Sequence, residues 1–132
     1  MNIETVKEGE FEYIEKGDGP VVILLHGLMG GLDNFEQLIN QLPNSGYKVV
    51  GPLLPLFDKP LLKTSIKHFT KYIHSFIEFK GYKDVTLIGN SLGGHISLVF
   101  AQKYPELVKR LVLTGSSGLY ESSMGSSFPR RG

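Results

Sequence analysis

A serine stands between two glycines where an apolar run passes into a helical pattern. The segment 89–93, Gly-Asn-Ser-Leu-Gly, fits G-x-S-x-G and follows the apolar run 85–88. In a sharp strand-to-helix turn the serine hydroxyl is exposed, and small residues two positions before and after it avoid a collision across the turn. The spacing predicts Ser91 as a nucleophile supported by Gly89 and Gly93. The alternative is a glycine-rich helix start that only packs closely on a sheet.

A second glycine-rich turn, 26–31, follows the first apolar run, 21–25, and reads His-Gly-Leu-Met-Gly-Gly. Attack on a carbonyl group creates an oxyanion that two preorganised N–H donors must hold. We expect one donor to be Leu92, beside the nucleophile at a helix N-terminus, where the helix dipole favours negative charge. The other is expected to be Leu28, with Met29 as the second choice. The alternative is an ordinary turn between strand and helix.

The elements between these turns must bring them together, and about 63 residues separate the turns. Apolar patterning predicts strands over 10–15, 21–25, 47–50, 84–88 and 109–114, and helices over 35–42, 64–80 and 92–104. Alternating strands and helices predict an α/β fold, a mostly parallel sheet with helices on both faces. The strands before the two turns can then be neighbours at a switch point, where crevices form in such sheets.

Polar residues of the predicted helices give two local expectations. Asp33 precedes the helix 35–42 and is expected to cap it, with Glu36 completing a capping-box pattern. His68 and His74 flank the apolar stripe of the helix 64–80, so both are expected to be exposed.

In this order, the segments HGLMGG and GNSLGGH resemble the α/β-hydrolase superfamily, especially its esterase and carbon–carbon-bond hydrolase branches. The resemblance covers about residues 10–128. It implies that the first segment, with His26 and Gly27 supporting the turn, supplies an oxyanion donor at Leu28. It implies that the second supplies the nucleophile and the donor Leu92. The substrate implied is a small molecule with a carbonyl group, and no cofactor or metal is expected.

The family's catalytic order is serine, then acid, then histidine, and this chain does not complete it. Only 41 residues follow Ser91, and they hold one histidine, His95, and two carboxylates, Glu106 and Glu121. His95 lies one helical turn on, where its side chain should point along the helix and away from the serine hydroxyl. Glu106 is expected to be solvated, Glu121 is a candidate acid, and His26 is expected to stabilise its loop by hydrogen bonding.

The resemblance therefore implies the N-terminal half of an α/β-hydrolase core with a mostly parallel sheet, truncated before the cap. Residues 1–114 would form the partial core, and residues 115–132 a Ser/Gly-rich loop leading toward an absent cap. The strand 109–114 would then be left with a bare edge. The parent protein would be a serine hydrolase and the 132-residue chain alone inactive. Oligomeric state, and whether the chain folds alone, stay open.

Composition excludes several other functions. Apolar residues make up 41% and charged residues 20% of the chain, and its net charge is +1, so neither nucleic acid nor anionic membrane is an expected partner. The absence of cysteine excludes disulfides, thiolate zinc sites and a cysteine nucleophile. The charged N-terminus does not resemble a signal peptide, and the longest apolar run is too short to span a bilayer. We therefore expect a cytoplasmic location.

Other functions remain to be weighed. A complete chain of this length would favour a non-catalytic domain that binds a small molecule. An acyltransferase or a lyase would use the same two turns on the same fold. A nucleotide-binding domain is disfavoured, because no G-x-G-x-x-G follows the first strand and the chain has no G-x-x-x-x-G-K-[ST].

Overall fold

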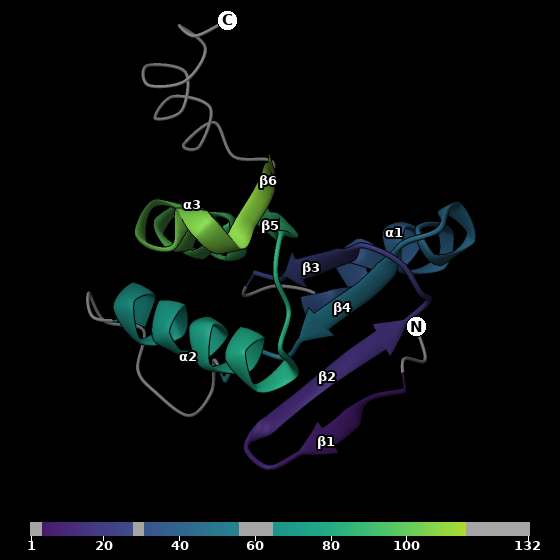
Figure 1. Cartoon of the computed structure of the whole chain (residues 1–132), viewed down its shortest axis with the longest axis horizontal. Helices are drawn as coiled ribbons and strands as arrows, with labels where there is room; N and C mark the ends of the chain where they lie inside the picture. The colour runs from purple at the N-terminus through teal and green to yellow at the C-terminus, as the bar shows by residue number, and fades with distance from the viewer. Residues whose placement is uncertain (1–3, 28–30, 56–64, 116–132) are drawn as a thin grey trace, which may run out of the picture.

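A six-stranded sheet forms the framework of the structure (Figure 1). The computed structural model describes residues 4–27, 31–55 and 65–115. In chain order the strands are β1 (Val6–Glu8), β2 (Phe11–Lys16), β3 (Val21–Leu25), β4 (Lys48–Pro52), β5 (Val85–Asn90) and β6 (Val108–Thr114). They lie side by side in the order β1-β2-β4-β3-β5-β6.

Four of the strands, β4, β3, β5 and β6, form a parallel sheet, and β1 and β2 add an antiparallel edge to it. The mostly parallel sheet predicted from the apolar runs is confirmed. β6 stands at one end of the strand order, the edge position expected for it. β1 was not predicted, because its three residues are all exposed and show no apolar alternation.

The strands that precede the two glycine-rich turns are direct neighbours. β3 pairs with β5 in parallel, and Leu25, at the end of β3, lies opposite Gly89. Parallel strands end at the same edge of a sheet, so the turns that follow β3 and β5 emerge side by side. This is the adjacency that the sequence predicts.

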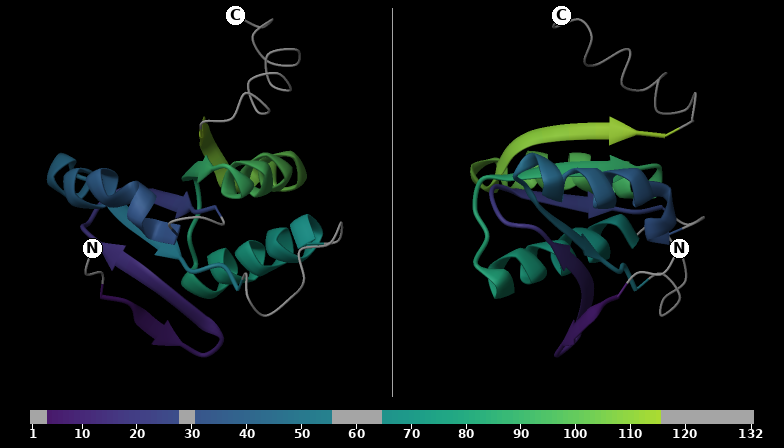
Figure 2. Two further views of the ribbon diagram at one scale, coloured as in Figure 1. Left: turned by 180° about the vertical axis from the view of Figure 1, so that it is seen from behind. Right: turned by 90° about the vertical axis from the view of Figure 1, so that its right-hand side faces the viewer.

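Helices cover both faces of the sheet (Figure 2). They are α1 (Glu36–Gln41), α2 (Ser65–Lys80) and α3 (Leu92–Lys103), with 3₁₀ turns η1 (Gly31–Phe35), η2 (Pro43–Ser45) and η3 (Pro105–Leu107). The capping role expected of Asp33 is wrong: Asp33 lies inside η1, and the residue before α1 is Phe35, which makes no side-chain cap. None of the helices in the described ranges is long and apolar enough to cross a membrane.

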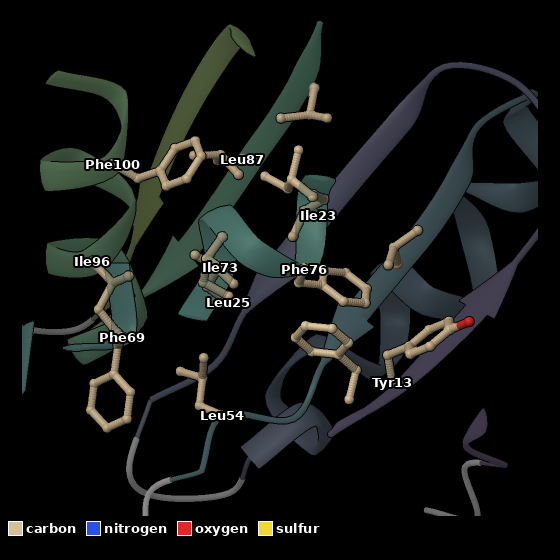
Figure 3. Close-up of a cluster of buried hydrophobic side chains, with 14 residues drawn as sticks. Tyr13, Ile23, Leu25, Leu54, Phe69, Ile73, Phe76, Leu87, Ile96 and Phe100 are labelled. Atoms are coloured by element: carbon tan, nitrogen blue, oxygen red, sulfur yellow. The ribbon is translucent and has the colours of Figure 1, made fainter. Parts of the chain in front are cut away.

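The apolar run of β3 supplies side chains to two separate cores. Val22 and Leu24 pack toward α1, while Ile23 and Leu25 pack toward α2 and α3. A sheet that is covered on both faces needs apolar side chains at every strand position, which explains a continuous run instead of alternation. Figure 3 shows the larger core, in which the buried helix side chains include Phe69, Ile73, Phe76, Ile96 and Phe100.

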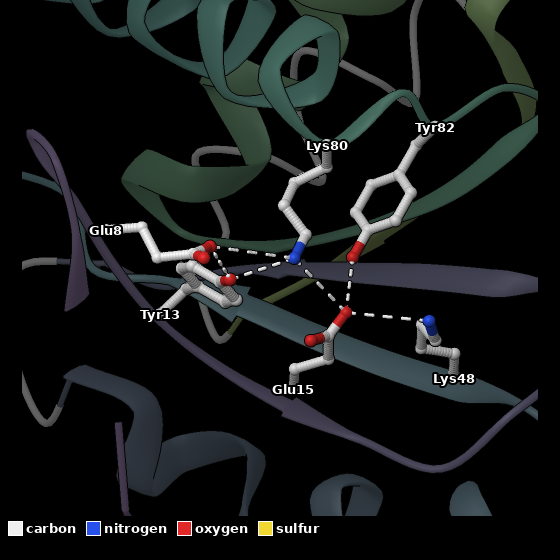
Figure 4. A network of polar contacts seen from close by, with 6 residues as sticks. All are labelled: Glu8, Tyr13, Glu15, Lys48, Lys80 and Tyr82. Atoms are coloured by element: carbon white, nitrogen blue, oxygen red, sulfur yellow. Dashed lines mark hydrogen bonds and ion pairs between the residues drawn. The ribbon is translucent and has the colours of Figure 1, made fainter. Parts of the chain in front are cut away.

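Six polar residues join the C-terminal end of α2 to β1, β2 and β4: Glu8, Tyr13, Glu15, Lys48, Lys80 and Tyr82 (Figure 4). The Lys80 ammonium donates to the Tyr13 hydroxyl at 2.8 Å and lies 3.5 Å from the Glu15 carboxylate. The Tyr82 hydroxyl donates to the same carboxylate at 2.7 Å. Burial, together with that hydrogen bond, raises the pKa of Tyr82, so its hydroxyl stays a neutral donor. The network fixes α2 against the antiparallel edge.

Candidate active site

Ser91 occupies the single residue between β5 and α3, and its backbone is strained. Its φ of 57° and ψ of −117° fall in a region that residues with a side chain seldom adopt. Such a conformation costs about 1–3 kcal/mol and persists only where the surroundings impose it. The side chain is exposed. The chain therefore turns sharply from strand to helix with a serine at the apex, the geometry that the G-x-S-x-G spacing predicts.

Hydrogen bonds from two elements hold the backbone of Ser91. Its carbonyl oxygen accepts from the amides of Gly94 at 2.9 Å and His95 at 3.1 Å, both in the first turn of α3. Its own N–H donates to the carbonyl oxygen of Thr114, at the end of β6, at 3.2 Å. The backbone carbonyl oxygen of this strained residue is thus bonded by the helix, and its backbone N–H by the neighbouring strand.

Gly89 and Gly93 are required by close approaches on either side of the turn. A Cβ atom on Gly89 would overlap the carbonyl oxygen of Gly93 and the hydroxyl of Ser97. This is the collision across the turn that the sequence predicts. A Cβ on Gly93 would instead overlap the carbonyl oxygen of Leu25, because α3 begins directly against the end of β3. The second glycine therefore serves helix–sheet packing, a reason that the motif alone does not reveal.

Gly27 brings the turn after β3 into contact with the turn that carries Ser91. A Cβ atom on Gly27 would lie 3.1 Å from the Cβ and 3.6 Å from the Oγ of Ser91, and 3.1 Å from the carbonyl oxygen of Asn90. The backbone at Gly27 is therefore adjacent to the serine hydroxyl. A turn at this distance is where a donor to an oxyanion formed at Ser91 would have to lie.

His26 ties this turn to the segment that follows β4. The amide of Leu54 donates to Nε2 of His26 at 3.0 Å, so Nε2 is unprotonated and Nδ1 carries the hydrogen. Nδ1 then donates to the carbonyl oxygen of Gly27 at 2.8 Å. The ring is 4% exposed, and burial lowers its pKa. His26 is a neutral, structural residue, as the sequence predicts.

The buried neutral imidazole of His26 should make stability depend on pH. Its folded-state pKa lies below the ordinary value of about 6.5. Between these two values the unfolded chain binds a proton that the folded chain does not. The free energy of unfolding is therefore highest above about pH 6.5, and below it falls by up to about 1.4 kcal/mol per pH unit until the folded-state pKa is passed. Urea unfolding between pH 7.5 and 5.5 measures this slope.

The control for this prediction is the exposed histidine of α2. His26→Gln cannot titrate and should flatten the slope between pH 7 and 5.5, whatever its own stability. His68→Gln makes the same substitution at an exposed position of α2 and is the matched control. Equal slopes in the wild type and His26→Gln would contradict the assignment.

Of the two predicted oxyanion donors, the structure describes one. Leu92 is the first residue of α3, and the first amide of a helix has no acceptor within the helix. It lies at the positive end of the helix dipole, beside Ser91. Leu28 and Met29 lie outside the described residues, directly after Gly27.

The ionisable residues considered as catalytic partners are spread over the molecule. His95 is exposed on α3, and Glu106 is exposed in η3. Glu121 lies outside the described residues.

The exposure expected of His74 is wrong: its side chain is 26% exposed, because the ring stacks on that of Tyr104 with centroids 4.0 Å apart.

The end of β6 was not predicted as part of the site. Thr114 accepts the N–H of Ser91 through its carbonyl oxygen and donates its hydroxyl to Oδ1 of Asn90 at 3.1 Å. Gly115, which follows, lies beside both residues. A signal existed, because parallel strands end at a common edge and the predicted strand 109–114 ends at Thr114.

Sequence comparisons match nearly the whole chain. The sequence model of the alpha/beta hydrolase fold matches residues 20–130. Lipase 1 of Psychrobacter immobilis is 33% identical over 122 residues, which cover 87% of this chain and 38% of the lipase. The 2-hydroxy-6-oxo-6-phenylhexa-2,4-dienoate hydrolase of Comamonas testosteroni is 32% identical over 114 residues, 81% of this chain and 40% of that enzyme. The chain thus spans about two fifths of the length of these relatives.

Solved structures share the arrangement of strands and helices. An alpha/beta hydrolase enzyme from the metagenome of sediments from the lagoon of Mar Chica, Morocco, matches with a TM-score of 0.79 at 47% identity, over 94% of this chain and 58% of that enzyme. An epoxide hydrolase from Vigna radiata matches with a TM-score of 0.72 at 28% identity, over 85% of this chain and 39% of that enzyme. Sequence and structure point to one family.

Proposed function

The chain belongs to the alpha/beta hydrolase fold family, and from this premise we propose that it carries the nucleophile of a serine hydrolase. The nucleophile is Ser91, and the substrate is a small molecule with an ester or a related carbonyl group. The observation that carries the proposal is the backbone of Ser91. A serine held at φ 57° between a parallel strand and a helix N-terminus has a strained conformation of the kind that clusters at active sites.

The proposed reaction is acyl transfer to the serine, followed by hydrolysis. Oγ of Ser91 attacks the carbonyl carbon and gives its proton to a general base while the carbonyl oxygen becomes an oxyanion. The amides of Leu92 and Leu28 hold that oxyanion. The leaving group departs with the proton, and water then attacks the acyl-serine to release the acid and restore the hydroxyl.

The general base and the acid that orients it are proposed to come from residues beyond this chain. The chain spans about two fifths of the relatives' length, and after Ser91 it holds a single histidine, His95, whose side chain is exposed on α3. We propose residues 1–114 as part of the hydrolase core and residues 115–132 as the segment that leads toward a cap.

Two kinds of bond cleavage fit this proposal. One relative is named a lipase, and another is named for a 2-hydroxy-6-oxo dienoate. Cleavage of an ester and cleavage of a carbon–carbon bond beside a carbonyl both pass through an oxyanion that Leu92 could hold. Ester hydrolysis is the form to test first, because activated esters report on any serine hydrolase of this kind.

A fluorophosphonate probe tests the nucleophile directly in the protein expressed from its complete reading frame. The label should appear on the tryptic peptide 84–103, and fragment ions should place it on Ser91 and not on Ser97, which is buried with its hydroxyl bonded to Gly93. Heat-denatured protein should not be labelled, since an unactivated serine is a poor nucleophile. Labelling at another residue would overturn the proposal and place the nucleophile elsewhere. No labelling at all would overturn it and favour a non-catalytic binding domain.

A further inference from the structure

We propose that Thr114, the last residue of β6, is a positioning residue for the nucleophile. It touches the turn that carries Ser91 through its backbone and through its side chain. This inference rests on the proposed function, because it assigns Thr114 a part in setting the rate at which Ser91 reacts.

The backbone contact extends the pairing of β5 and β6 onto the nucleophile itself. Asn90 lies opposite Thr114 at the end of the parallel ladder. One residue beyond it, the N–H of Ser91 donates to the carbonyl oxygen of Thr114 at 3.2 Å. The amide of the nucleophile is therefore held by β6, while its carbonyl oxygen is held by α3.

The side chain of Thr114 adds a second contact to the same turn. Its hydroxyl lies 3.1 Å from Oδ1 of Asn90 and 3.5 Å from the carbonyl oxygen of Gly89. A hydroxyl has one hydrogen to donate, and the shorter distance favours Asn90 as the acceptor. Thr114 thus contacts Asn90 through its hydroxyl and Ser91 through its carbonyl oxygen.

Gly115 keeps the chain close to the turn after this contact. Its φ is 138°, and a Cβ atom there would lie 3.3 Å from the amide nitrogen of Ser91 and 3.5 Å from Oδ1 of Asn90. A glycine is suited to this conformation and to this approach. The end of β6 is therefore packed against the nucleophile turn, although it precedes a segment that the sequence assigns to a loop.

This arrangement matters because the strain at Ser91 must be imposed by its surroundings. α3 fixes one side of the residue through its own helical bonds. β6 fixes the other side, and the Thr114 hydroxyl is a side-chain link between the end of that strand and the turn. Without the hydroxyl, Asn90 and the end of β6 gain freedom, and Oγ of Ser91 spends less time at the attack position. Loss of the hydroxyl should change kcat more than KM, because the alignment of the reacting atoms is sensitive to small displacements.

The test compares Thr114→Val with Thr114→Ser in the protein expressed from its complete reading frame. Valine keeps the branched shape and the backbone contact but removes the hydroxyl, whereas serine restores it. With p-nitrophenyl butyrate, kcat should fall about 10-fold in Thr114→Val with KM changed less than about 2-fold, and Thr114→Ser should recover most of the loss. Thr86→Val removes the same hydroxyl from β5 away from the turn, so it should leave kcat unchanged.

A readout that needs no turnover separates this inference from the proposed function. Amide hydrogen exchange at Ser91 should be about 10-fold faster in Thr114→Val than in wild type, and unchanged in Thr86→Val. Wild-type exchange and wild-type kcat in Thr114→Val would overturn the inference. So would a fall in kcat matched by an equal fall in Thr86→Val. If the wild type neither turns over esters nor takes the fluorophosphonate, the proposed function fails, whatever the exchange rates show.

Discussion

Ser91→Ala is expected to lower kcat for an activated ester by about 10⁴-fold or more and to abolish fluorophosphonate labelling. The proposed acyl intermediate forms on Oγ, and without that atom only oxyanion stabilisation and binding remain. The measurement is p-nitrophenyl butyrate turnover in the protein expressed from its complete reading frame. Ser75→Ala, which removes an exposed hydroxyl from α2, is the matched control and should keep wild-type activity. Activity that survives in Ser91→Ala would place the nucleophile elsewhere.

The same position allows a test of the backbone strain. Alanine keeps a Cβ atom at φ 57° and ψ −117°, whereas glycine removes the steric penalty of about 1–3 kcal/mol. Part of that gain is offset by the greater freedom of glycine in the unfolded chain. Ser91→Gly should therefore be inactive, yet more stable to urea than Ser91→Ala by about 1 kcal/mol. Equal stability of the two variants would show that the strain at this position is no larger than the cost of the greater freedom of glycine in the unfolded chain.

The parallel sheet and the adjacency of the two turns could be predicted from the sequence, for a physical reason. A strand that is buried on both faces must be apolar throughout, and the runs 21–25 and 85–88 have this property. Glycine and serine residues then mark where these strands end. The order of the runs allowed the strands before the two turns to be neighbours, and the structure pairs them, which brings the two turns to one edge of the sheet.

What the sequence could not reveal depends on contacts between distant residues. The network around Lys80 joins α2 to Glu8 and Glu15, which lie about 65 to 72 positions away. Nothing in the local pattern of these charged residues distinguishes them from solvated ones. His74 was predicted to be exposed because it lies outside the apolar stripe of α2. In the structure its ring stacks on that of Tyr104, the residue that follows α3. The 3.6-residue spacing of apolar residues identifies the buried face of one helix, but it does not reveal which neighbouring residues cover its other faces.

Local rules also failed where a short irregular turn intervened. Asp33 and Glu36 have the spacing of a capping box, yet the chain forms the 3₁₀ turn η1 before α1 begins. Asp33, which was expected to cap α1, therefore lies inside η1 and not at the residue before the helix. The contact of Thr114 with Asn90 was missed for a different reason, because it depends on the register of β5 and β6, which an apolar pattern does not define.

Gly93→Ala is expected to destabilise the fold by about 3 kcal/mol or more, a large part of the usual stability of a domain. Two effects oppose each other at this position. Alanine favours a helix over glycine by about 1 kcal/mol, so substitution at an unhindered site in α3 would stabilise the protein. At Gly93 the added Cβ would overlap the carbonyl oxygen of Leu25 and lie 2.7 Å from that of His26. These are backbone atoms of β3 and its turn, and they cannot move aside as a side chain could.

Whether Gly93→Ala lowers or raises the free energy of unfolding therefore tests the close packing of α3 against β3. Urea unfolding of Gly93→Ala should show a lower midpoint, and fluorophosphonate labelling should fall with it, because the start of α3 carries both Ser91 and the Leu92 amide. His95→Ala changes an exposed position of the same helix and should unfold near the wild-type midpoint. A Gly93→Ala protein as stable as wild type would mean that the gain in helix propensity offsets the cost of the contact, and that the turn at Ser91 tolerates a wider gap than its geometry indicates.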